Sequence, residues 1–224
     1  MSMIIWQQLL FILLGFFSGS IMFSYLLPKL IYKKDIIALS DDHNPGMANV
    51  LTYAGKKMGA VCLVLDMAKG FIPVYFAGIY LEHDNLLFSL VISAPVLGHA
   101  FCPFLKFKGG KAVAVTFGSL LGTFEYSLSW LILALSTLFF TAVISIYPHS
   151  LRIIISVIPF VVYTLIFEHC FPVTVGCLII SIVLTYTHIR GYNSQPFNIK
   201  FFCIKKPPIP DDIPDTDEVK HHKI

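Results

Sequence analysis

Charged side chains are scarce in this sequence. Asp, Glu, Lys and Arg make up 13% of its 224 residues, whereas a soluble domain carries about 25%. The first charged residue is Lys29, and hydrophobic residues account for 56% of the chain. These figures exclude a soluble enzyme, a disordered protein and a nucleic-acid-binding protein. A net charge of +3 is also too small to indicate a polyanionic partner.

Paired cysteines are lacking as well. The five cysteines are scattered without C-x-x-C spacing, which indicates neither a disulfide framework nor a metal site. The N-terminus lacks the basic residues of a cleaved signal peptide, and the apolar stretch 1–28 is longer than a signal core. We therefore expect this stretch to remain as the first membrane helix.

Long apolar runs are abundant, and short polar segments that carry nearly every charge separate them. The runs lie at about 4–28, 58–80, 86–105, 112–124, 127–147, 153–167 and 171–188. Since one crossing needs about 20 apolar residues, the sequence predicts an all-α, polytopic integral membrane protein with about seven transmembrane helices. Run 112–124 is short, and Tyr147-Pro148 is either a loop or a kink, which leaves about five or six crossings open.

Basic residues collect on one side of this arrangement. They follow the first, third and seventh runs, for example in KLIYKKD (29–35) and KFKGGK (106–111), whereas the opposite loops carry Glu82, Glu125 and Glu168 without Lys or Arg. Cytoplasmic loops of membrane proteins are rich in Lys and Arg. The pattern predicts an N-terminus outside, a cytoplasmic C-terminus and an odd number of crossings.

The sequence indicates one domain followed by a tail. We expect residues 1–204 to form a single transmembrane domain. The segment 205–224 holds four prolines and five carboxylates among few apolar residues. It cannot bury a core, so it is expected to be a disordered cytoplasmic tail.

The segment GHAFCPFLKFKGGKAV (98–113) has the composition of a phosphate site. Gly109 and Gly110 could turn their backbone N–H groups toward an anion, the following helix would add partial positive charge, and Lys111 would add a full charge. Lysines at the cytoplasmic end of a crossing also occur for topological reasons alone. His99, near the start of this segment, is either a packed interfacial residue or a catalytic one.

Two further groups of polar residues could be functional. The connector 35–59 is rich in side chains that form hydrogen bonds, which an idle loop would not need. Asp66 and Lys69 lie three residues apart, on one face of a membrane helix, and form either a functional pair or a structural one. No file of charges crosses several runs, which makes a transporter or channel the weaker hypothesis.

Three segments resemble successive motifs of the bacterial acyl-phosphate:glycerol-3-phosphate acyltransferases of the PlsY type. They are GSIMFSYLLPKL (19–30), NVLTYAGKKMGAVCLVLDMAKGFIP (49–73) and GHAFCPFLKFKGGKAVA (98–114). The resemblance implies a multi-pass enzyme of the bacterial plasma membrane that moves a fatty acyl group from acyl phosphate to glycerol-3-phosphate. Its product would be lysophosphatidic acid for phospholipid synthesis. Its partners would be these two substrates and the lipid bilayer, without a cofactor or nucleic acid.

The resemblance also implies functional residues by position. Those with a catalytic role would be His99, Lys111 and His188. Those that bind substrate would be Asn44, Gly46, Asn49, Lys108, Gly109, Gly110, Arg190 and Asn193. Lys111 would hold a substrate phosphate together with the two glycines, and no residue is expected to bind a metal.

The chain departs from the family in its first polar segment. The usual GSGNxGATN corresponds to residues 41–49, where Asp41, Asp42 and His43 replace Gly, Ser and Gly, and Thr52 replaces the usual Arg. A serine element expected before the sixth helix has only Ser145 and Ser150 as weak candidates. The carboxylates could repel phosphate or hold it through Mg²⁺. The alternative is therefore a divergent paralogue with an altered acceptor or no catalysis, which acts as a membrane interaction protein.

Overall fold

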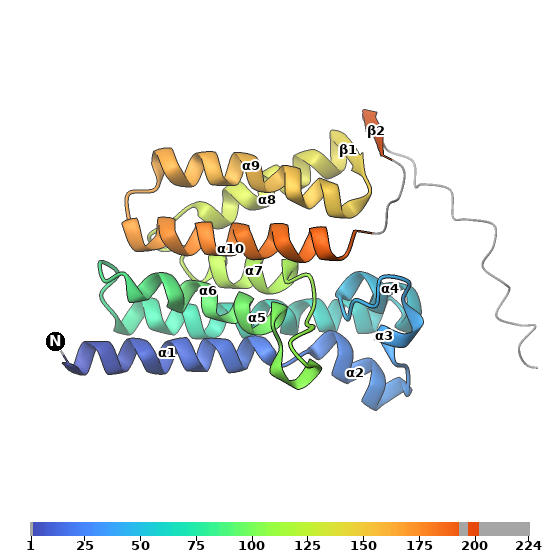
Figure 1. Ribbon diagram of the computed structural model, residues 1–224, viewed down its shortest axis with the longest axis horizontal. Helices are drawn as coiled ribbons and strands as arrows, with labels where there is room; N and C mark the ends of the chain where they lie inside the picture. The colour runs from blue at the N-terminus through green and yellow to red at the C-terminus, as the bar shows by residue number, and fades with distance from the viewer. Residues whose placement is uncertain (1, 193–196, 202–224) are drawn as a thin grey trace, which may run out of the picture.

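The computed structural model describes residues 2–192 and 197–201. Most of its helices run along one common direction in a bundle (Figure 1). The helices are α1 (Ser2–Ser20), α2 (Phe23–Tyr32), α3 (Ile36–Leu39), α4 (Met47–Ala54), α5 (Lys56–Tyr80), α6 (Leu87–Ala100), α7 (Val113–Leu121), α8 (Ser129–Ala142), α9 (His149–Phe167) and α10 (Phe171–Arg190). The helical fold predicted from the sequence is confirmed. The predicted tail 205–224 and residue Asn193 lie outside the described residues.

One short sheet was not predicted. Strand β1 (Ile144–Tyr147) pairs antiparallel with β2 (Asn198–Phe201), with Ile144 opposite Phe201 and Tyr147 opposite Asn198. The run 127–147 therefore ends as a helix at Ala142, and α9 begins directly after Tyr147-Pro148. Tyr147-Pro148 therefore lies in the connection between α8 and α9 and is not a kink within one continuous helix.

Within the described residues, four helical segments are long and apolar enough to cross a membrane. They are α5, Leu87–Leu105, α9 and α10. The pair α1 and α2 adds a fifth if its two helices, bent by 41° at a short break, count as one crossing. Helices α7 and α8, of 9 and 14 residues, are shorter than the runs from which we predicted them.

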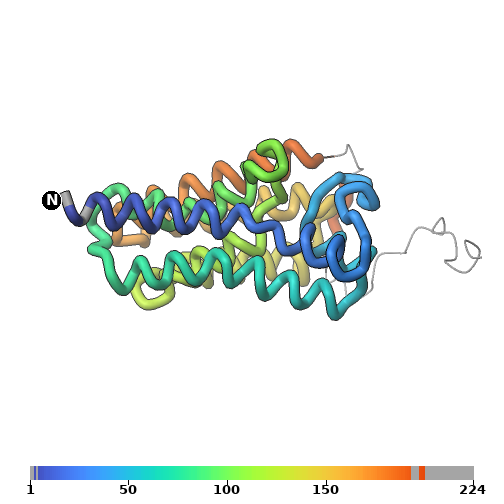
Figure 2. The backbone as a smooth tube through the Cα atoms, turned by 90° about the horizontal axis from the view of Figure 1, so that it is seen from below, coloured from blue at the N-terminus to red at the C-terminus, as the bar shows by residue number. Residues whose placement is uncertain are grey.

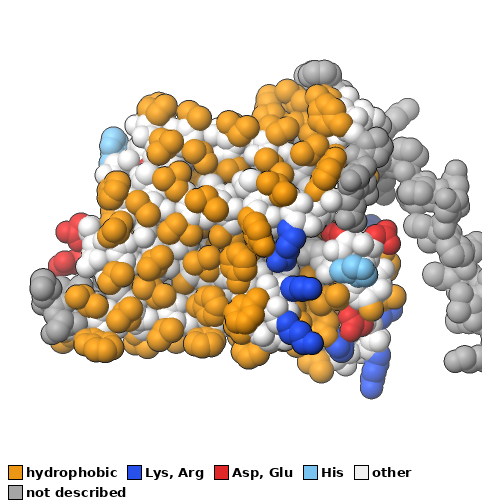
Figure 3. Space-filling model, in the orientation of Figure 1, with side chains coloured by type: hydrophobic (Ala, Val, Ile, Leu, Met, Phe, Trp, Pro, Cys, Tyr) orange, Lys and Arg blue, Asp and Glu red, His pale blue; other side chains and the backbone are white. Residues whose placement is uncertain are grey.

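The outside of the bundle is apolar. Large side chains such as Trp6, Leu165 and Ile182 are 71%, 60% and 68% exposed, and hydrophobic side chains cover most of the face in Figure 3. Lys and Arg gather on that face toward the end where α2–α4 lie. Such a surface suits contact with lipid along the bundle and with water at its ends.

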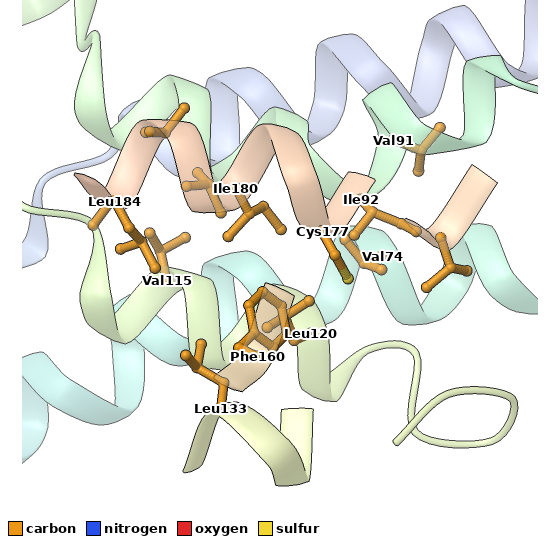
Figure 4. Close-up of a cluster of buried hydrophobic side chains, with 14 of the residues drawn as sticks. Val74, Val91, Ile92, Val115, Leu120, Leu133, Phe160, Cys177, Ile180 and Leu184 are labelled. Atoms are coloured by element: carbon orange, nitrogen blue, oxygen red, sulfur yellow. The ribbon is translucent and has the colours of Figure 1, made fainter. Parts of the chain in front are cut away.

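The core lies where α5, α6, α7, α9 and α10 meet. Its buried side chains include Val74, Ile92, Leu120, Phe160 and Ile180 (Figure 4). Small residues let neighbouring helices approach closely, as is common inside membrane proteins. A Cβ at Gly98 of α6 would overlap the Phe16 carbonyl of α1, and one at Gly118 of α7 would overlap the Met67 carbonyl of α5.

The connector 35–59 is more ordered than the expected loop. It folds into α3 and α4, which pack with the start of α5 around a small cluster of Ile36, Val50, Met58 and Cys62. Asp35 caps α3 by accepting a hydrogen bond from the Ala38 N–H (3.3 Å). Figure 2 shows the segment α2–α4 gathered at the end of the bundle opposite the N-terminus. This segment forms one wall of the candidate site.

Candidate active site

Two adjoining cavities lie beside the α3–α4 segment and share Asp42, Asn44 and Lys111 as lining residues. The first, which we name the polar cavity, has a volume of about 540 Å³ and is also lined by Lys106, Lys108, Gly109, Gly110 and Arg190. The second, the apolar cavity, has about 350 Å³ and is also lined by Leu63, Val113, Phe117, His99, His149 and His188. Lys111 thus lines both the polar cavity, which is rich in cationic side chains, and the apolar cavity.

Lys111 is anchored from two sides. Its backbone N–H donates to Asn44 Oδ1 (3.2 Å), and its carbonyl accepts from Thr187 Oγ1 of α10 (3.2 Å). Its Nζ forms an ion pair with Asp42 Oδ2 at 2.9 Å, in which both side chains are only about one-fifth exposed (21% and 23%). The ammonium group is therefore held at the boundary between the two cavities. Helix α7 begins two residues later, as predicted.

Asp42 is an ionised partner in this pair. Burial alone would raise the pKa of its carboxyl group, but hydrogen bonds from Lys111, Asn49 and the Asn44 N–H, together with the positive charge of Lys111, hold the pKa below its ordinary value. Asn49 Nδ2 lies 2.8 Å from Asp42 Oδ1. Asp41, in contrast, is exposed and lines neither cavity. Of the two carboxylates that depart from the family pattern, only Asp42 reaches the site.

The glycine pair serves a different purpose from the one expected. The Gly109 N–H donates to the Ala100 carbonyl (3.1 Å), and the Gly110 N–H donates to the His99 carbonyl (3.2 Å). The last carbonyls of a helix lack partners inside that helix, and these two N–H groups satisfy them at the end of α6. The expectation that they face an anion is therefore wrong for this structure. Glycine is needed because a Cβ at position 109 would overlap the His99 carbonyl oxygen.

The polar cavity keeps several cations available for an anionic ligand. Arg190 at the end of α10 donates from Nη2 to the Gly109 carbonyl (3.3 Å) and lies over the Tyr186 ring, 5.7 Å from its centroid. Lys108 is exposed and lines the same cavity. Side chains, rather than backbone N–H groups of the glycine pair, thus supply the positive charge.

His188 is buried on α10 with a defined tautomer. Its Nδ1 lies 2.8 Å from the Leu184 carbonyl, which can only accept a hydrogen bond, so Nδ1 carries the proton. Its Nε2 then holds a lone pair, and this buried atom makes no hydrogen bond within the described residues. His149, the first residue of α9, stacks nearly parallel to His188 with 6.4 Å between ring centroids. Sequence reasoning missed His149, although its place directly after Tyr147-Pro148 could have drawn attention to it.

Most of the predicted site residues meet at these two cavities. The apolar cavity collects Asn44, Gly46, Asn49, His99, Lys111 and His188, and the polar cavity collects Lys108, Gly109, Gly110 and Arg190. Thr52 is exposed, and neither Ser145 nor Ser150 lines the polar or the apolar cavity. No group of three or more His, Cys, Asp or Glu among the described residues could hold a metal ion.

The fold and the cavities define a class of protein: a helical, multi-pass membrane protein with a cationic pocket and an apolar one side by side at one end. A family model described as glycerol-3-phosphate acyltransferase matches residues 9–194. The chain belongs to this family.

Sequence relatives and solved structures agree with this assignment. The glycerol-3-phosphate acyltransferase of Endomicrobium trichonymphae is 33% identical over 181 residues, which cover 81% of this chain and 88% of the relative. That of Thermotoga petrophila is 41% identical over 133 residues, or 57% and 67% of the two chains. The crystal structure of PlsY, an integral membrane glycerol 3-phosphate acyltransferase, in its glycerol 3-phosphate form superposes with a TM-score of 0.71 at 28% identity, covering 82% of this chain and 88% of PlsY.

Proposed function

We propose that this protein transfers a fatty acyl group from acyl phosphate to the 1-hydroxyl of glycerol-3-phosphate, producing lysophosphatidic acid for phospholipid synthesis. The observation that carries the proposal is the shared wall of the two cavities, where Lys111 borders both. A polar substrate with a phosphate suits the cationic cavity, and an acyl phosphate suits the apolar one. Lys111 can then reach a phosphate in either cavity.

The residues divide the work by their chemistry. Lys108, Lys111 and Arg190 neutralise substrate phosphate, and Asn44 and Asn49 shape the wall that faces it. The hydroxyl oxygen of the acceptor forms a bond to the acyl carbonyl carbon, and the bond from that carbon to the phosphate oxygen breaks. Phosphate leaves with the electron pair, and the hydroxyl proton passes to the lone pair on His188 Nε2. Because a mixed anhydride is already activated, positioning and charge neutralisation are sufficient and no covalent enzyme intermediate is needed.

We further propose how the protein lies in the membrane. The bent pair α1–α2, the helices α5, α6, α9 and α10, and the shorter α7 and α8 would make seven crossings in a single domain of residues 1–204. The basic end with Lys111 would face the cytoplasm of a bacterial cell, where acyl phosphate is made. The N-terminus and the acidic loop with Glu82 would lie outside.

The test is an assay of the purified chain in lipid nanodiscs with glycerol-3-phosphate and palmitoyl phosphate. Lysophosphatidic acid and phosphate should form in equal amounts, whereas palmitoyl-CoA in place of the acyl phosphate should give neither. If a folded protein makes no lysophosphatidic acid from either donor, the proposal fails.

One observation favours a second candidate, a divergent paralogue with an altered acceptor or no catalysis. The cation that should bind phosphate is already paired with Asp42, a residue that replaces the serine of the related motif. Complementation of a bacterial strain that lacks this acyltransferase would separate the two readings, since a paralogue without the activity would not restore growth.

A further inference from the structure

A buried ion pair lies next to the site at the break between α1 and α2. Asp66 and Lys69, both on α5, are 2% and 4% exposed, and Lys69 Nζ lies 2.7 Å from Asp66 Oδ1. The prediction that these two residues share one helix face is confirmed. The pair is more than a self-contained bridge, because Lys69 Nζ also lies 2.9 Å from Nδ1 of the buried His99 on α6.

The break explains why the pair is there. Where α1 ends, the Ile21 carbonyl lacks a helical partner, and a membrane interior offers no water to replace it. Lys69 Nζ donates to this carbonyl (2.5 Å), and Ser24 at the start of α2 donates to Asp66 Oδ2 (2.5 Å). The Lys69 ammonium group has three hydrogens. Its Nζ hydrogen-bonds to the Ile21 carbonyl and to His99 Nδ1, and it forms an ion pair with Asp66.

These contacts fix the proton on His99. An ammonium group donates three hydrogen bonds and accepts none. Burial alone would disfavour the charged form of Lys69, but the Asp66 carboxylate at 2.7 Å compensates the charge. His99 Nδ1 must therefore accept, with its lone pair toward Lys69. A neutral imidazole that accepts at one nitrogen carries its proton on the other, so the proton of His99 is on Nε2.

The Nε2 atom of His99 lies at the wall of the site. A Cβ at Gly110 would overlap it, and His99 lines the apolar cavity together with Asn44 and Lys111. Glycine at position 110 thus leaves the space in front of this N–H group clear. His188 lines the same cavity in the opposite tautomer, with its lone pair on Nε2. One histidine can donate and the other can accept.

We propose that Lys69 is a positioning residue that locks His99 in the Nε2–H tautomer, so that His99 donates a hydrogen bond to an anionic oxygen of the bound substrate. This inference rests on the proposed function, since it assumes that a phosphate or an acyl phosphate enters the cavity. The anionic oxygen belongs either to a substrate phosphate or to the acyl carbonyl as it gains charge during transfer. Lys69 itself lines neither cavity and acts through His99.

The first test measures the tautomer directly and needs no activity. ¹⁵N spectra of ring-labelled histidine in the full chain should show His99 protonated at Nε2, with the signal assigned by its loss in His99→Gln. The double variant Asp66→Asn, Lys69→Met removes the donor to Nδ1 without leaving a buried unpaired charge, and His99 should then populate both tautomers. A proton on Nδ1 in the native protein, or an unchanged tautomer in a folded double variant, would overturn the proposal.

The second test compares two amides in place of His99. The side-chain N–H of Gln falls near Nε2 of the original ring, whereas that of Asn falls near Nδ1. His99→Gln should therefore retain at least about tenfold more activity than His99→Asn. A rise in the KM for glycerol-3-phosphate in His99→Asn would assign the bond to its phosphate, and a fall in kcat at constant KM would assign it to the acyl carbonyl. Equal losses in two folded variants would reject the donor role, and an inactive native protein would reject the proposed function while the spectra still test the tautomer.

Discussion

Asp42 and Lys111 lie 69 positions apart in the chain and form an ion pair of 2.9 Å. The pair ties the segment between α3 and α4 to the start of α7, at the boundary of the two cavities. A carboxylate at this position does more than repel phosphate, because it neutralises the cation that a phosphate would bind. If Lys111 binds substrate phosphate as we propose, the phosphate competes with Asp42 for the Lys111 ammonium group.

Loss of Lys111 should be the most damaging change in the polar cavity. Lys111→Ala removes a charge-assisted contact to phosphate and leaves Asp42 without its partner, so kcat/KM for acyl transfer should fall about ten- to hundredfold. The measurement is lysophosphatidic acid formation at several concentrations of glycerol-3-phosphate. Lys57→Ala is the matched control, since Lys57 is exposed at the start of α5 and lines neither cavity. Equal rates in the Lys111 and Lys57 variants would show that Lys111 contributes only to the orientation of the protein in the membrane and does not bind substrate.

Replacement of Asp42 by the serine of the related motif should strengthen substrate binding. Asp42→Ser frees the Lys111 ammonium group, so the KM for glycerol-3-phosphate should fall severalfold. The assay is run with and without Mg²⁺, because carboxylates can hold a phosphate through this ion. A higher KM in Asp42→Ser, seen only when Mg²⁺ is present, would show that the carboxylate binds substrate through the metal.

The free energy of unfolding should depend on pH because of the ion pair between Asp42 and Lys111. The pKa of Asp42 in the folded protein lies below its ordinary value of 3.8, so the pair stabilises the fold above that value and loses its contribution as the pH falls through the lowered pKa. The difference in free energy of unfolding between the native protein and Asp42→Asn should be constant between about pH 8 and pH 5 and shrink below about pH 4. Denaturant unfolding in detergent measures it. Asp41→Asn, at an exposed position outside the cavities, should show a smaller difference throughout.

The proposed orientation can be tested independently of catalysis. A cysteine placed at Glu82, in a chain whose native cysteines are replaced, should react with an impermeant reagent added outside the cell. A reporter fused after Lys206 should read cytoplasmic. Protection of position 82 together with an outside reporter would show that the protein has the opposite orientation. Lys111 would then lie on the outer side of the membrane, away from the acyl phosphate made in the cytoplasm.

Hydropathy predicted the long helices well, because apolar runs of crossing length leave few alternatives in a membrane. It was less informative where tertiary contacts decide the structure. The polar sequence of the connector 35–59 predicts a loop. Ile36 and Val50 are nevertheless buried in a cluster with residues of α5, and this packing stabilises the helices α3 and α4. Strand β1 is only four residues long, and its partner β2 lies more than fifty residues further along the chain.

Most of the residues predicted for the site line the two cavities, but the sequence did not predict their hydrogen bonds. Motif positions located His99, Lys111 and His188 near one another, but sequence spacing carries no information on which hydrogen bonds are already made. The N–H groups of Gly109 and Gly110 end α6 instead of facing an anion, and His149 enters the site through the packing of α9 against α10. The contact from Lys69 to His99 depends on the break between α1 and α2, which no periodicity predicts.

The side-by-side arrangement of the two cavities has a consequence for what happens after the reaction. Lysophosphatidic acid is an amphiphile that belongs in the bilayer, whereas inorganic phosphate belongs in water. If the proposed transfer takes place at the wall that the two cavities share, the acyl chain of the product lies in the apolar cavity and the phosphate lies beside the cationic side chains of the polar one. Lysophosphatidic acid and phosphate would then diffuse into different phases. The reverse reaction, which needs both of them in the site at once, would therefore be rare without any conformational change.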